Sequence, residues 1–229
     1  MRLDRFLNHK LRLGGKAVRQ LLIEDRVKLN GEIVRSGTVE VGEFCRVSVD
    51  DRVLQDREAL YYMINKPAGY VSVRNDPVYH SALELVDIPN NAELHTAGRL
   101  DLDTTGLFIV TNDGAWSRRL TDPDSKKPKV YRVETSRPVS EACEALFAEG
   151  MRLLPEDIVT QPAKLERLGE REVRLIIYEG RYRQIKRMFW RFENKVVALH
   201  RERMGDIELD DRLEPGQFRS LTEDEIASV

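Results

Sequence analysis

The sequence predicts an α+β protein of two domains: a small α/β domain over residues 1–58, and a larger domain over residues 59–229 with a mostly antiparallel mixed sheet flanked by helices. The chain has 229 residues, of which 41% are hydrophobic, and this is enough for one or two domains that each bury a core. The hydrophobic pattern changes near residue 59 from helical spacing to short runs, and the polar stretch 55–58 suits a linker. In the second part, strands outnumber helices and do not alternate regularly with them, which argues against a parallel doubly wound sheet.

The first domain is predicted to contain two helices followed by a β-hairpin and a further strand. Gly14-Gly15 separates two stretches in which apolar residues recur at helical spacing, at Leu3, Phe6, Leu7 and Leu11, and then at Val18, Leu21 and Leu22. Val27 and Leu29 alternate with Lys28, as in a half-buried strand. The following Asn30-Gly31 is typical of a type I′ hairpin turn, in which both central residues need positive φ. A second alternating run at 45–49 predicts the further strand.

The second domain is predicted to contain six strands and three longer helices. The strand candidates are short apolar runs bounded by turn residues, at 60–65, 107–112, 130–135, 162–166, 173–178 and 196–200. The helix candidates lie at 115–121, 141–149 and 183–192. Thr222 and Glu225 fit a capping box, so a last turn of helix is expected to begin there.

Several classes of protein are disfavoured by what the sequence lacks. Cys45 and Cys143 lie far apart and form no CxxC pair, so neither a zinc site nor a disulfide framework is expected. The sequence contains no GxGxxG, P-loop or HExxH motif. No apolar run is long enough to span a bilayer, and the first residues lack the apolar core of a signal peptide. We therefore expect a cytoplasmic protein that does not enter a membrane.

The charge of the chain is segregated along the sequence, although its sum is close to zero. There are 37 Lys and Arg against 39 Asp and Glu, which gives a net charge of −2. Three segments are basic, with net charges of +5 over 1–35, +4 over 118–132 and +6 over 181–203, whereas 36–58 carries −3 and 204–229 carries −6. Charges act over roughly 8–10 Å in physiological salt, so a local basic segment can bind an anionic partner whatever the sum. One charge run is usually a solvated face, but three together favour such a partner.

The segment 95–106 is the strongest candidate for a reactive site. Gly98 permits an unusual backbone angle, and Arg99 and Asp101 lie two residues apart, so their side chains point the same way in an extended segment. Residues 103–106 have turn chemistry, and a carboxylate on a loop in front of a buried strand is well placed to react. The alternative interpretation is an aspartate that only stabilises its loop through a salt bridge.

Two basic segments carry further candidates. The segment 179–189 ends a strand at Gly180 and begins a basic helix, an arrangement that suits a phosphate or a lone carboxylate. The segment 126–132 leads basic residues into a strand that carries Tyr131, whose ring could stack on an unpaired base. Taken alone, a solvated helix face and an ordinary core tyrosine are the commoner explanations of these two patterns.

Together these motifs resemble those of a known enzyme family, the RNA pseudouridine synthases. The run Gly98-Arg99-Leu100-Asp101, followed by residues 103–107, resembles the active-site motif of the family. Residues 65–70 resemble its first motif, and residues 179–188 resemble its third. The resemblance covers nearly the whole chain. The combination of motifs is closest to the RsuA family, which is associated with small-subunit ribosomal RNA.

The resemblance implies an isomerase that converts uridine into pseudouridine in RNA and requires no cofactor or metal. It assigns the essential catalytic role to Asp101, which either attacks C1′ of the ribose or removes a ribose proton. It places Lys186 as the basic partner that lowers the pKa of this carboxyl group, with Arg183 as the second choice. Tyr131 would stack against the flipped uracil, and Arg99 would fill the vacated space or hold the phosphate.

The remaining assignments concern the contacts with RNA. Residues 1–58 resemble the S-four RNA-binding domain of ribosomal proteins, except that Gly15-Lys16 stands where that domain commonly has Ser-Arg. Leu175 or Ile177 is expected to form the apolar floor beneath the base. The basic residues expected to contact RNA are Arg2, Arg5, Lys16, Arg19, Lys66, Lys129, Arg181 and Arg187.

The partner implied is 16S ribosomal RNA or an assembly intermediate of the small subunit, bound by a monomer. The alternatives are a non-catalytic RNA-binding factor of ribosome assembly and a synthase that acts on large-subunit rRNA. A glycosidase is less consistent with the sequence, because it needs two carboxylates that face one bond. Asp103 lies close to Asp101 on a tight turn, which is poor geometry for that role. The three basic segments are expected to line one face, and the acidic tail 204–229 is expected to lie away from it.

Overall fold

The computed structural model describes residues 1–89 and 91–229 and divides into two compact units, Met1–Ala59 and Leu60–Val229. Each unit buries its own apolar core, with Leu3, Leu7 and Val47 in the first and Phe108 and Phe189 in the second. No helix in the described residues combines the length and the apolar character needed to cross a membrane.

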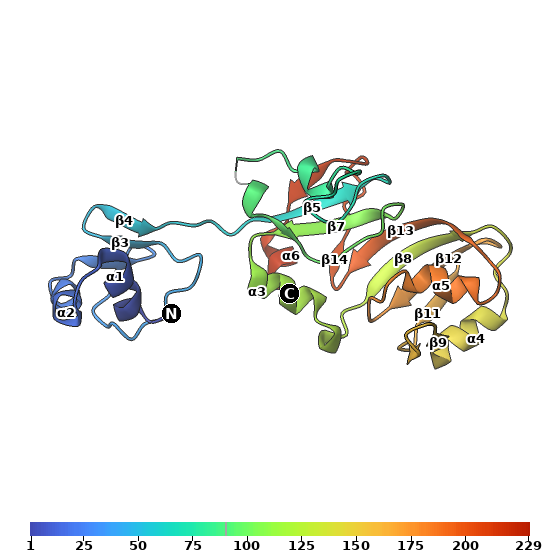
Figure 1. The fold of residues 1–229 in the computed structure, drawn as a ribbon, viewed down its shortest axis with the longest axis horizontal. Coiled ribbons are helices and arrows are strands. Elements are labelled where there is room, and N and C mark those ends of the chain that lie inside the picture. Colours follow the sequence, from blue (N-terminus) through green and yellow to red (C-terminus); the bar gives the residue numbers. More distant parts are fainter. Residues whose placement is uncertain (90) are drawn as a thin grey trace. The chain divides into compact units, whose positions relative to one another are not determined.

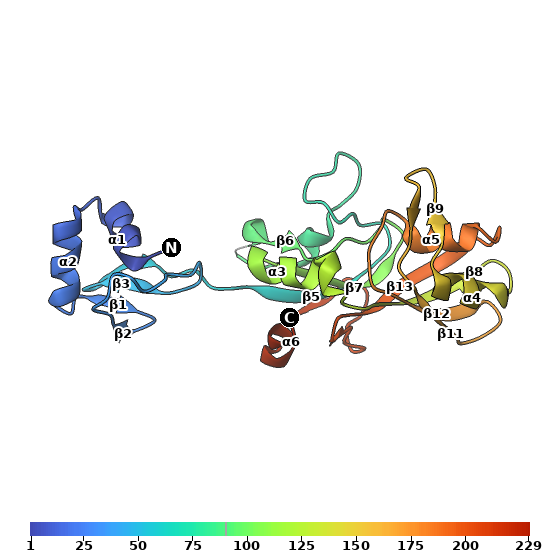
Figure 2. The same cartoon turned by 90° about the horizontal axis from the view of Figure 1, so that it is seen from below.

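The first unit consists of two helices packed against a four-stranded sheet. Both helices lie on one side of this sheet, and their apolar residues meet the strands in a single core (Figure 2). The sheet has the order β2-β1-β3-β4. The elements are α1 (Leu3–Leu11), α2 (Gly15–Ile23), β1 (Val27–Leu29), β2 (Glu32–Ile33), β3 (Val47–Val49) and β4 (Arg52–Gln55).

In the first unit, the hairpin turn and the end of the first helix have backbone conformations that agree with the sequence. Asn30 and Gly31 have φ of 52° and 89°, as a type I′ turn requires, and they connect paired Leu29 and Glu32. Helix α1 ends at Arg12, which adopts the left-handed conformation with φ of 54°. The predicted helices and hairpin are therefore confirmed.

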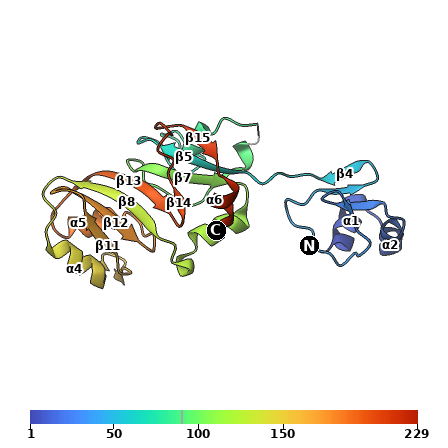
Figure 3. The ribbon, with the colours of Figure 1, turned by 180° about the vertical axis from the view of Figure 1, so that it is seen from behind.

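The second unit is built on a nine-stranded mixed sheet. Its central order is β11-β12-β8-β13-β7-β5-β15, with β14 paired to β13 and β6 paired to β7 (Figure 3). Among the described strand pairs of this sheet, β13 and β7 are the parallel pair and the others are antiparallel, which confirms the predicted mixed sheet. The strands are β5 (Tyr61–Lys66), β6 (His95–Thr96), β7 (Thr105–Thr111), β8 (Lys129–Thr135), β11 (Lys164–Arg167), β12 (Glu172–Ile177), β13 (Val196–Met204), β14 (Ile207–Glu208) and β15 (Phe218–Ser220).

Apolar side chains cover both faces of the sheet around β7. Phe108 and Val110 belong to the core shared with α4 and α5, whereas Leu107 and Ile109 belong to the core shared with α3 and α6. Figure 1 labels these four helices around the sheet. Because β7 is buried on both faces, its sequence is a continuous apolar run. The helices are α3 (Gly114–Thr121), α4 (Ala142–Glu149), α5 (Gln184–Trp190) and α6 (Glu223–Ala227), with short turns η1 (Ala82–Leu85), η2 (Asn91–Glu93) and η3 (Pro123–Ser125).

The main difference from the predicted elements is the length of β13. The sequence predicts this strand at 196–200, but it continues to Met204. Its charged residues stay in the strand because Arg201 turns its side chain into the protein and Arg203 pairs with β14. The short strands β6, β14 and β15, and the small hairpin of β9 (Arg152–Leu153) and β10 (Ile158–Val159), were not predicted, because two or three residues carry too little periodicity.

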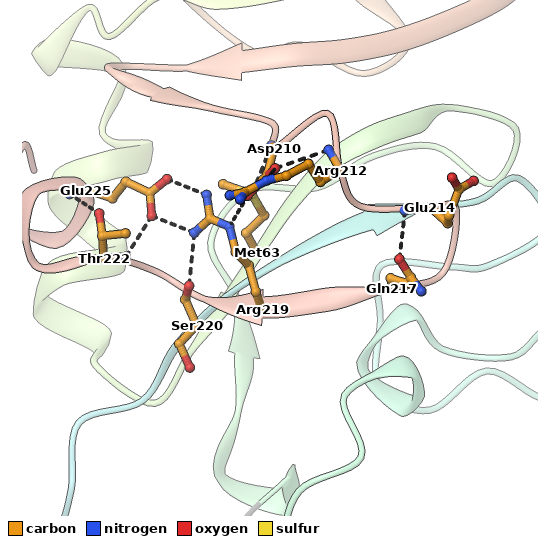
Figure 4. A network of polar contacts seen from close by, with 9 residues as sticks. All are labelled: Met63, Asp210, Arg212, Glu214, Gln217, Arg219, Ser220, Thr222 and Glu225. Atoms are coloured by element: carbon orange, nitrogen blue, oxygen red, sulfur yellow. Dashed lines mark hydrogen bonds and ion pairs between the residues drawn. The ribbon is translucent and has the colours of Figure 1, made fainter.

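The C-terminal tail pairs two of its acidic residues, Asp210 and Glu225, with its own arginines. The guanidinium of Arg219, on β15, donates to Asp210 at 2.7 Å and to Glu225 at 2.7 and 2.8 Å (Figure 4). Glu225 also closes the predicted capping box with Thr222 at the start of α6. Hydrogen bonds from Arg212 and then from Arg219 hold the pKa of Asp210 well below its usual range. The network therefore joins β15 and α6 to the turn after β14.

We predict that Asp210→Asn destabilises the second unit at neutral pH. Because the pKa of Asp210 is depressed in the folded state, its contribution is complete above the unfolded pKa of about 4 and is lost as the pH falls toward the folded value. The difference in unfolding free energy between wild type and variant should therefore shrink below about pH 4. Both tryptophans, Trp116 and Trp190, lie in this unit and report its urea unfolding. Asp211→Asn is the exposed control, and an equal loss there would contradict the prediction.

We also predict that Gly106→Ala weakens the junction of β7 and β13. Gly106 has φ of 98°, and a Cβ atom there would lie 2.4 Å from the carbonyl oxygen and 2.8 Å from the nitrogen of Arg201. We expect a loss of folding free energy on the order of 1–3 kcal/mol, because β13 must shift to make room. Gly169→Ala is the control, since its Cβ would meet Glu172 only at 3.8 Å. Equal urea midpoints for the two variants would be inconsistent with this account.

Candidate active site

A cavity of about 690 Å³ opens in the second unit and gathers residues that are far apart in the sequence. Its lining combines the loop after β6, the start of β8, the end of β12, the segment 179–186 and the middle of β13. All the residues predicted for the active site line it, namely Asp101, Arg99, Tyr131, Arg183 and Lys186. Of the described residues in the acidic tail 204–229, Met204 lines the cavity and none beyond it does, so the acidic residues of the tail lie outside the cavity.

The loop that carries Asp101 is held by its own backbone and by a buried serine. Gly98 has φ of 92°, which allows the chain to turn into the loop beside Met204. Leu100 donates its N–H to the hydroxyl of Ser72 at 2.9 Å, and this hydroxyl donates back to the Leu100 carbonyl at 2.6 Å. The N–H of Thr104 donates to the Asp101 carbonyl at 3.1 Å, which closes the turn. These contacts fix the direction in which the Asp101 side chain leaves the loop.

Lys66 lies beneath this turn and is fully buried. Its ammonium donates to the carbonyls of Thr104 at 2.8 Å, Pro67 at 3.0 Å, Asp101 at 3.3 Å and Leu102 at 3.4 Å. Burial lowers the pKa of Lys66 to about 8, although the nearby charges of Asp103 and Asp101 act in the opposite direction. The assignment of Lys66 to RNA contacts was therefore wrong, because backbone carbonyls occupy its ammonium inside the protein.

Lys186 of α5 connects the third motif to the Asp101 turn. Its Nζ lies 3.5 Å from Oδ2 of Asp101 and 2.5 Å from Oδ1 of Asp103. Burial acts to raise the pKa of Asp103, but the hydrogen bond and charge of Lys186 outweigh it, and the pKa lies below its usual value. Of the two basic candidates, the structure brings Lys186 to Asp101. Arg183 lies over the ring of Tyr182, with its guanidinium carbon 5.6 Å from the ring centre.

The segment before α5 is locked by a buried acid that sequence reasoning passed over. Glu179 is 3% exposed and accepts hydrogen bonds from Gln184 Nε2 at 3.0 Å and from the N–H of Gln161 at 2.8 Å. Arg181 donates its Nε to Glu179 at 3.1 Å and its N–H to Gln184 at 3.0 Å. The polar residues of this motif therefore shape one wall of the cavity, while half of the Arg181 side chain stays exposed.

The inner wall of the cavity is formed by strands β8, β12 and β13. Tyr131 is 7% exposed and lies between Leu175 of β12 and Arg201 of β13 in the strand register. Of the two candidates for the apolar floor, Ile177 lines the cavity, and Leu175 is buried and does not. Lys129 also belongs to this wall. Lys129 is buried, and this burial, followed by the charge of Arg201, lowers its pKa.

The remaining basic residues assigned to RNA fall into two groups. Arg187 does not line the cavity; its guanidinium bonds to Glu156 and to the carbonyls of Leu154 and Tyr182. These contacts tie the turn between β9 and β10 to α5. The assignment of Arg187 to RNA stays a prediction. The others lie exposed on the first unit, at Arg2, Arg5, Lys16 and Arg19.

The arrangement is suited to chemistry on a nucleoside held inside the cavity. An aspartate can act as a nucleophile or a base there, with an ammonium group beside it and an aromatic ring on the inner wall. In the part of the chain that the structure describes, no three His, Cys, Asp or Glu side chains come together as a metal site would require.

Comparison with known proteins shows where this fold and site belong. The family model described as RNA pseudouridylate synthase matches residues 60–190. The ribosomal small subunit pseudouridine synthase A of Pseudomonas aeruginosa is 49% identical and that of Escherichia coli 44% identical, each over the whole of both chains. A crystal structure described as that of a pseudouridylate synthase superimposes with a TM-score of 0.73 at 43% identity and covers 100% of this chain and 99% of the other. The chain therefore belongs to the family of RNA pseudouridylate synthases, enzymes that isomerise uridine to pseudouridine.

Proposed function

We propose that this chain converts a specific uridine of 16S ribosomal RNA, free or in a small-subunit assembly intermediate, into pseudouridine, with Asp101 as its single essential catalytic residue. The observation that carries the proposal is the position of the Asp101 carboxylate in the cavity, 3.5 Å from the ammonium of Lys186. The full-length relatives named as small-subunit pseudouridine synthases support the choice of RNA. We propose further that the protein acts as a monomer in the cytoplasm.

The reaction exchanges one bond to the ribose for another. The N1–C1′ bond breaks, the uracil turns, C5 bonds to C1′, and C5 loses a proton while N1 gains one. Asp101 starts this sequence either by attacking C1′ or by removing a ribose proton, and both routes use its ionised form. Lys186 supplies the positive charge beside the carboxylate.

The target base must leave its stack to reach this carboxylate, at a cost of a few kcal/mol. Tyr131 then stacks against the uracil, with Ile177 as the apolar floor. Arg99 has an exposed side chain at the cavity and fills the vacated space or holds the phosphate. The exposed side chains of Arg181 and Arg183 add positive charge along the same lining, where the flanking phosphates would pass.

The first unit supplies a second set of phosphate contacts in this proposal. Arg5, Lys16 and Arg19 have exposed side chains on its two helices, where an S-four-like domain would meet RNA. Arg2 is also exposed, although it pairs with Asp4 at 2.5 Å. Exposed cations that neutralise phosphates release counterions, so this binding should weaken as salt rises.

We predict that Asp101→Asn abolishes pseudouridine formation and leaves RNA binding nearly intact. An amide can neither attack C1′ nor accept the ribose proton. The test uses Escherichia coli that lacks its own ribosomal small subunit pseudouridine synthase A: the wild-type chain should restore one pseudouridine in 16S rRNA, and the variant should restore none.

Asp103→Asn is the matched control for Asp101→Asn, because Asp103 shares the contact with Lys186 but is 67% exposed. It should retain activity. Activity in Asp101→Asn would overturn the catalytic assignment, and equal loss in both variants would favour a reaction with two carboxylates. Pseudouridine restored only in large-subunit rRNA would contradict the proposed substrate.

We predict that combined charge reversal at Arg5, Lys16 and Arg19 weakens RNA binding and flattens its salt dependence. Each lost phosphate contact lowers the slope of log K against log salt by about 0.7–0.9, so the triple variant should lose about 2–3. Affinities for 16S rRNA across a salt series measure this slope. Reversal of Arg46 and Arg52, in the acidic segment of the same unit, is the control, and an unchanged slope in the triple variant would remove these helices from the RNA surface.

A further inference from the structure

Arg201 is a buried cation in the cavity wall. Its side chain is 1% exposed, and among the described residues no carboxylate lies within ion-pairing distance of it. Its Nε donates to the Leu107 carbonyl at 2.8 Å, and its Nη1 makes a long contact of 3.5 Å with the Arg99 carbonyl. Its Nη2 has no hydrogen-bond partner in the described part of the chain. The charge is therefore held in place but not neutralised.

Such a position costs stability and calls for a functional explanation. An unpaired charge out of water carries a desolvation penalty, and a buried polar atom without a partner adds a further cost to folding. In the described part of the chain, two buried side-chain atoms lack a partner, Arg201 Nη2 and Thr104 Oγ1, and both residues line this cavity. Both of these buried polar atoms without hydrogen-bond partners therefore lie at the site.

The place of Arg201 in the sheet puts its charge beside the stacking tyrosine. Arg201 is directly opposite Tyr131 on β8, and directly opposite partners project from the same face about 4.5–5.5 Å apart at Cβ. On its other side Arg201 is opposite Gly106, whose missing side chain lets the two backbones approach closely. The charge of Arg201 also acts to lower the pKa of Lys129 and of Lys66, so this wall of the cavity is positive.

We propose that Arg201 stabilises the uracil anion that forms when the N1–C1′ bond breaks, an inference that rests on the proposed function of the site. The electron pair of the broken bond goes to the uracil, where the charge spreads over N1 and the ring carbonyl oxygens. It is consumed when C5 bonds to C1′, after which C5 loses its proton and N1 takes one up. A fixed charge in a water-poor wall needs no reorganisation to stabilise this anion.

A phosphate is the other anion that could meet Arg201, and the structure favours the base. The cations at the exposed part of the lining are Arg99, Arg181 and Arg183, where hydrated phosphates can pass. Arg201 lies instead on the inner wall with Tyr131, which is 7% exposed, in surroundings that suit a flat, weakly hydrated base. The interaction is also strongest there, because charges in a low dielectric are poorly screened.

The test compares Arg201→Gln, Arg201→Met and Arg201→Lys in single-turnover reactions at saturating 16S rRNA. Removing one preorganised donor at a developing anion costs about 10²–10³ in rate, so we expect losses of that order in the two neutral variants and partial recovery in the lysine variant. RNA affinity and its salt slope should be unchanged. Arg203→Gln is the matched control, because Arg203 is on the same strand but outside the cavity.

A second substrate separates electrostatic catalysis from a purely structural role. RNA with 5-fluorouridine at the target position carries a more acidic uracil, whose anion needs less stabilisation. The loss caused by Arg201→Gln, measured as disappearance of the target nucleoside, should therefore be much smaller with this RNA than with uridine. Both substrates react with the same folded fraction of the variant. The ratio of the two rate losses is therefore independent of any partial unfolding.

Three outcomes would overturn the inference. Equal losses with uridine and 5-fluorouridine would make Arg201 a structural residue. A salt slope lower by about 0.7–0.9 would make it a phosphate contact. Full activity in the neutral variants would remove it from the reaction. Failure of the wild-type chain to form pseudouridine in any RNA would instead refute the proposed function, so the two failures are distinguishable.

Discussion

The buried ammonium of Lys66 is the contact on which the geometry of the site depends. It gathers the carbonyls of Pro67, Asp101, Leu102 and Thr104 around one charge, and so holds the turn from which the Asp101 side chain projects. The ammonium adds a donor to each of these carbonyls, although Asp101 also accepts from the N–H of Thr104 and Leu102 from the N–H of Gly69. A buried carbonyl left unpaired would cost about 1–3 kcal/mol. The lowered pKa of Lys66, about 8, shows that burial still disfavours its charged form. Lys66 thus stabilises the turn, although burial disfavours its own charged form.

The parallel pairing of β13 with β7 extends this constraint to the rest of the cavity. Gly106 lets β13 approach β7 closely, and Arg201 then reaches the carbonyls of Leu107 and Arg99 on either side of the Asp101 turn. The same strand pairs with β8, which carries Tyr131. Strand β13 therefore positions the Asp101 turn, the ring of Tyr131 and the charge of Arg201 relative to one another. The cations of the site fall into two groups: buried ones that shape the cavity, and exposed ones that face solvent.

Much of the fold could be predicted because the relevant signals are local. The Asn30-Gly31 turn, the capping box at Thr222 and the apolar run of β7 each act within a few residues, and each appears in the structure as expected. The sequence predicts β13 only to residue 200, whereas the strand continues to Met204. The side chain of Arg201 is buried by β7 and β8, and no window of neighbouring residues contains that information.

The sequence by itself determined the two-part α+β organisation, the family resemblance and the set of residues that gather around Asp101. These rest on motifs and periodicity, which the chain carries whatever its tertiary contacts. Only the tertiary structure decided what each basic residue does: Lys66 binds the carbonyls of a turn, Arg187 ties down a hairpin, and Arg201 is buried with no counter-ion among the described residues. Lysine and arginine look alike in a charge count, but their roles depend on which oxygen atoms distant segments bring within hydrogen-bonding distance.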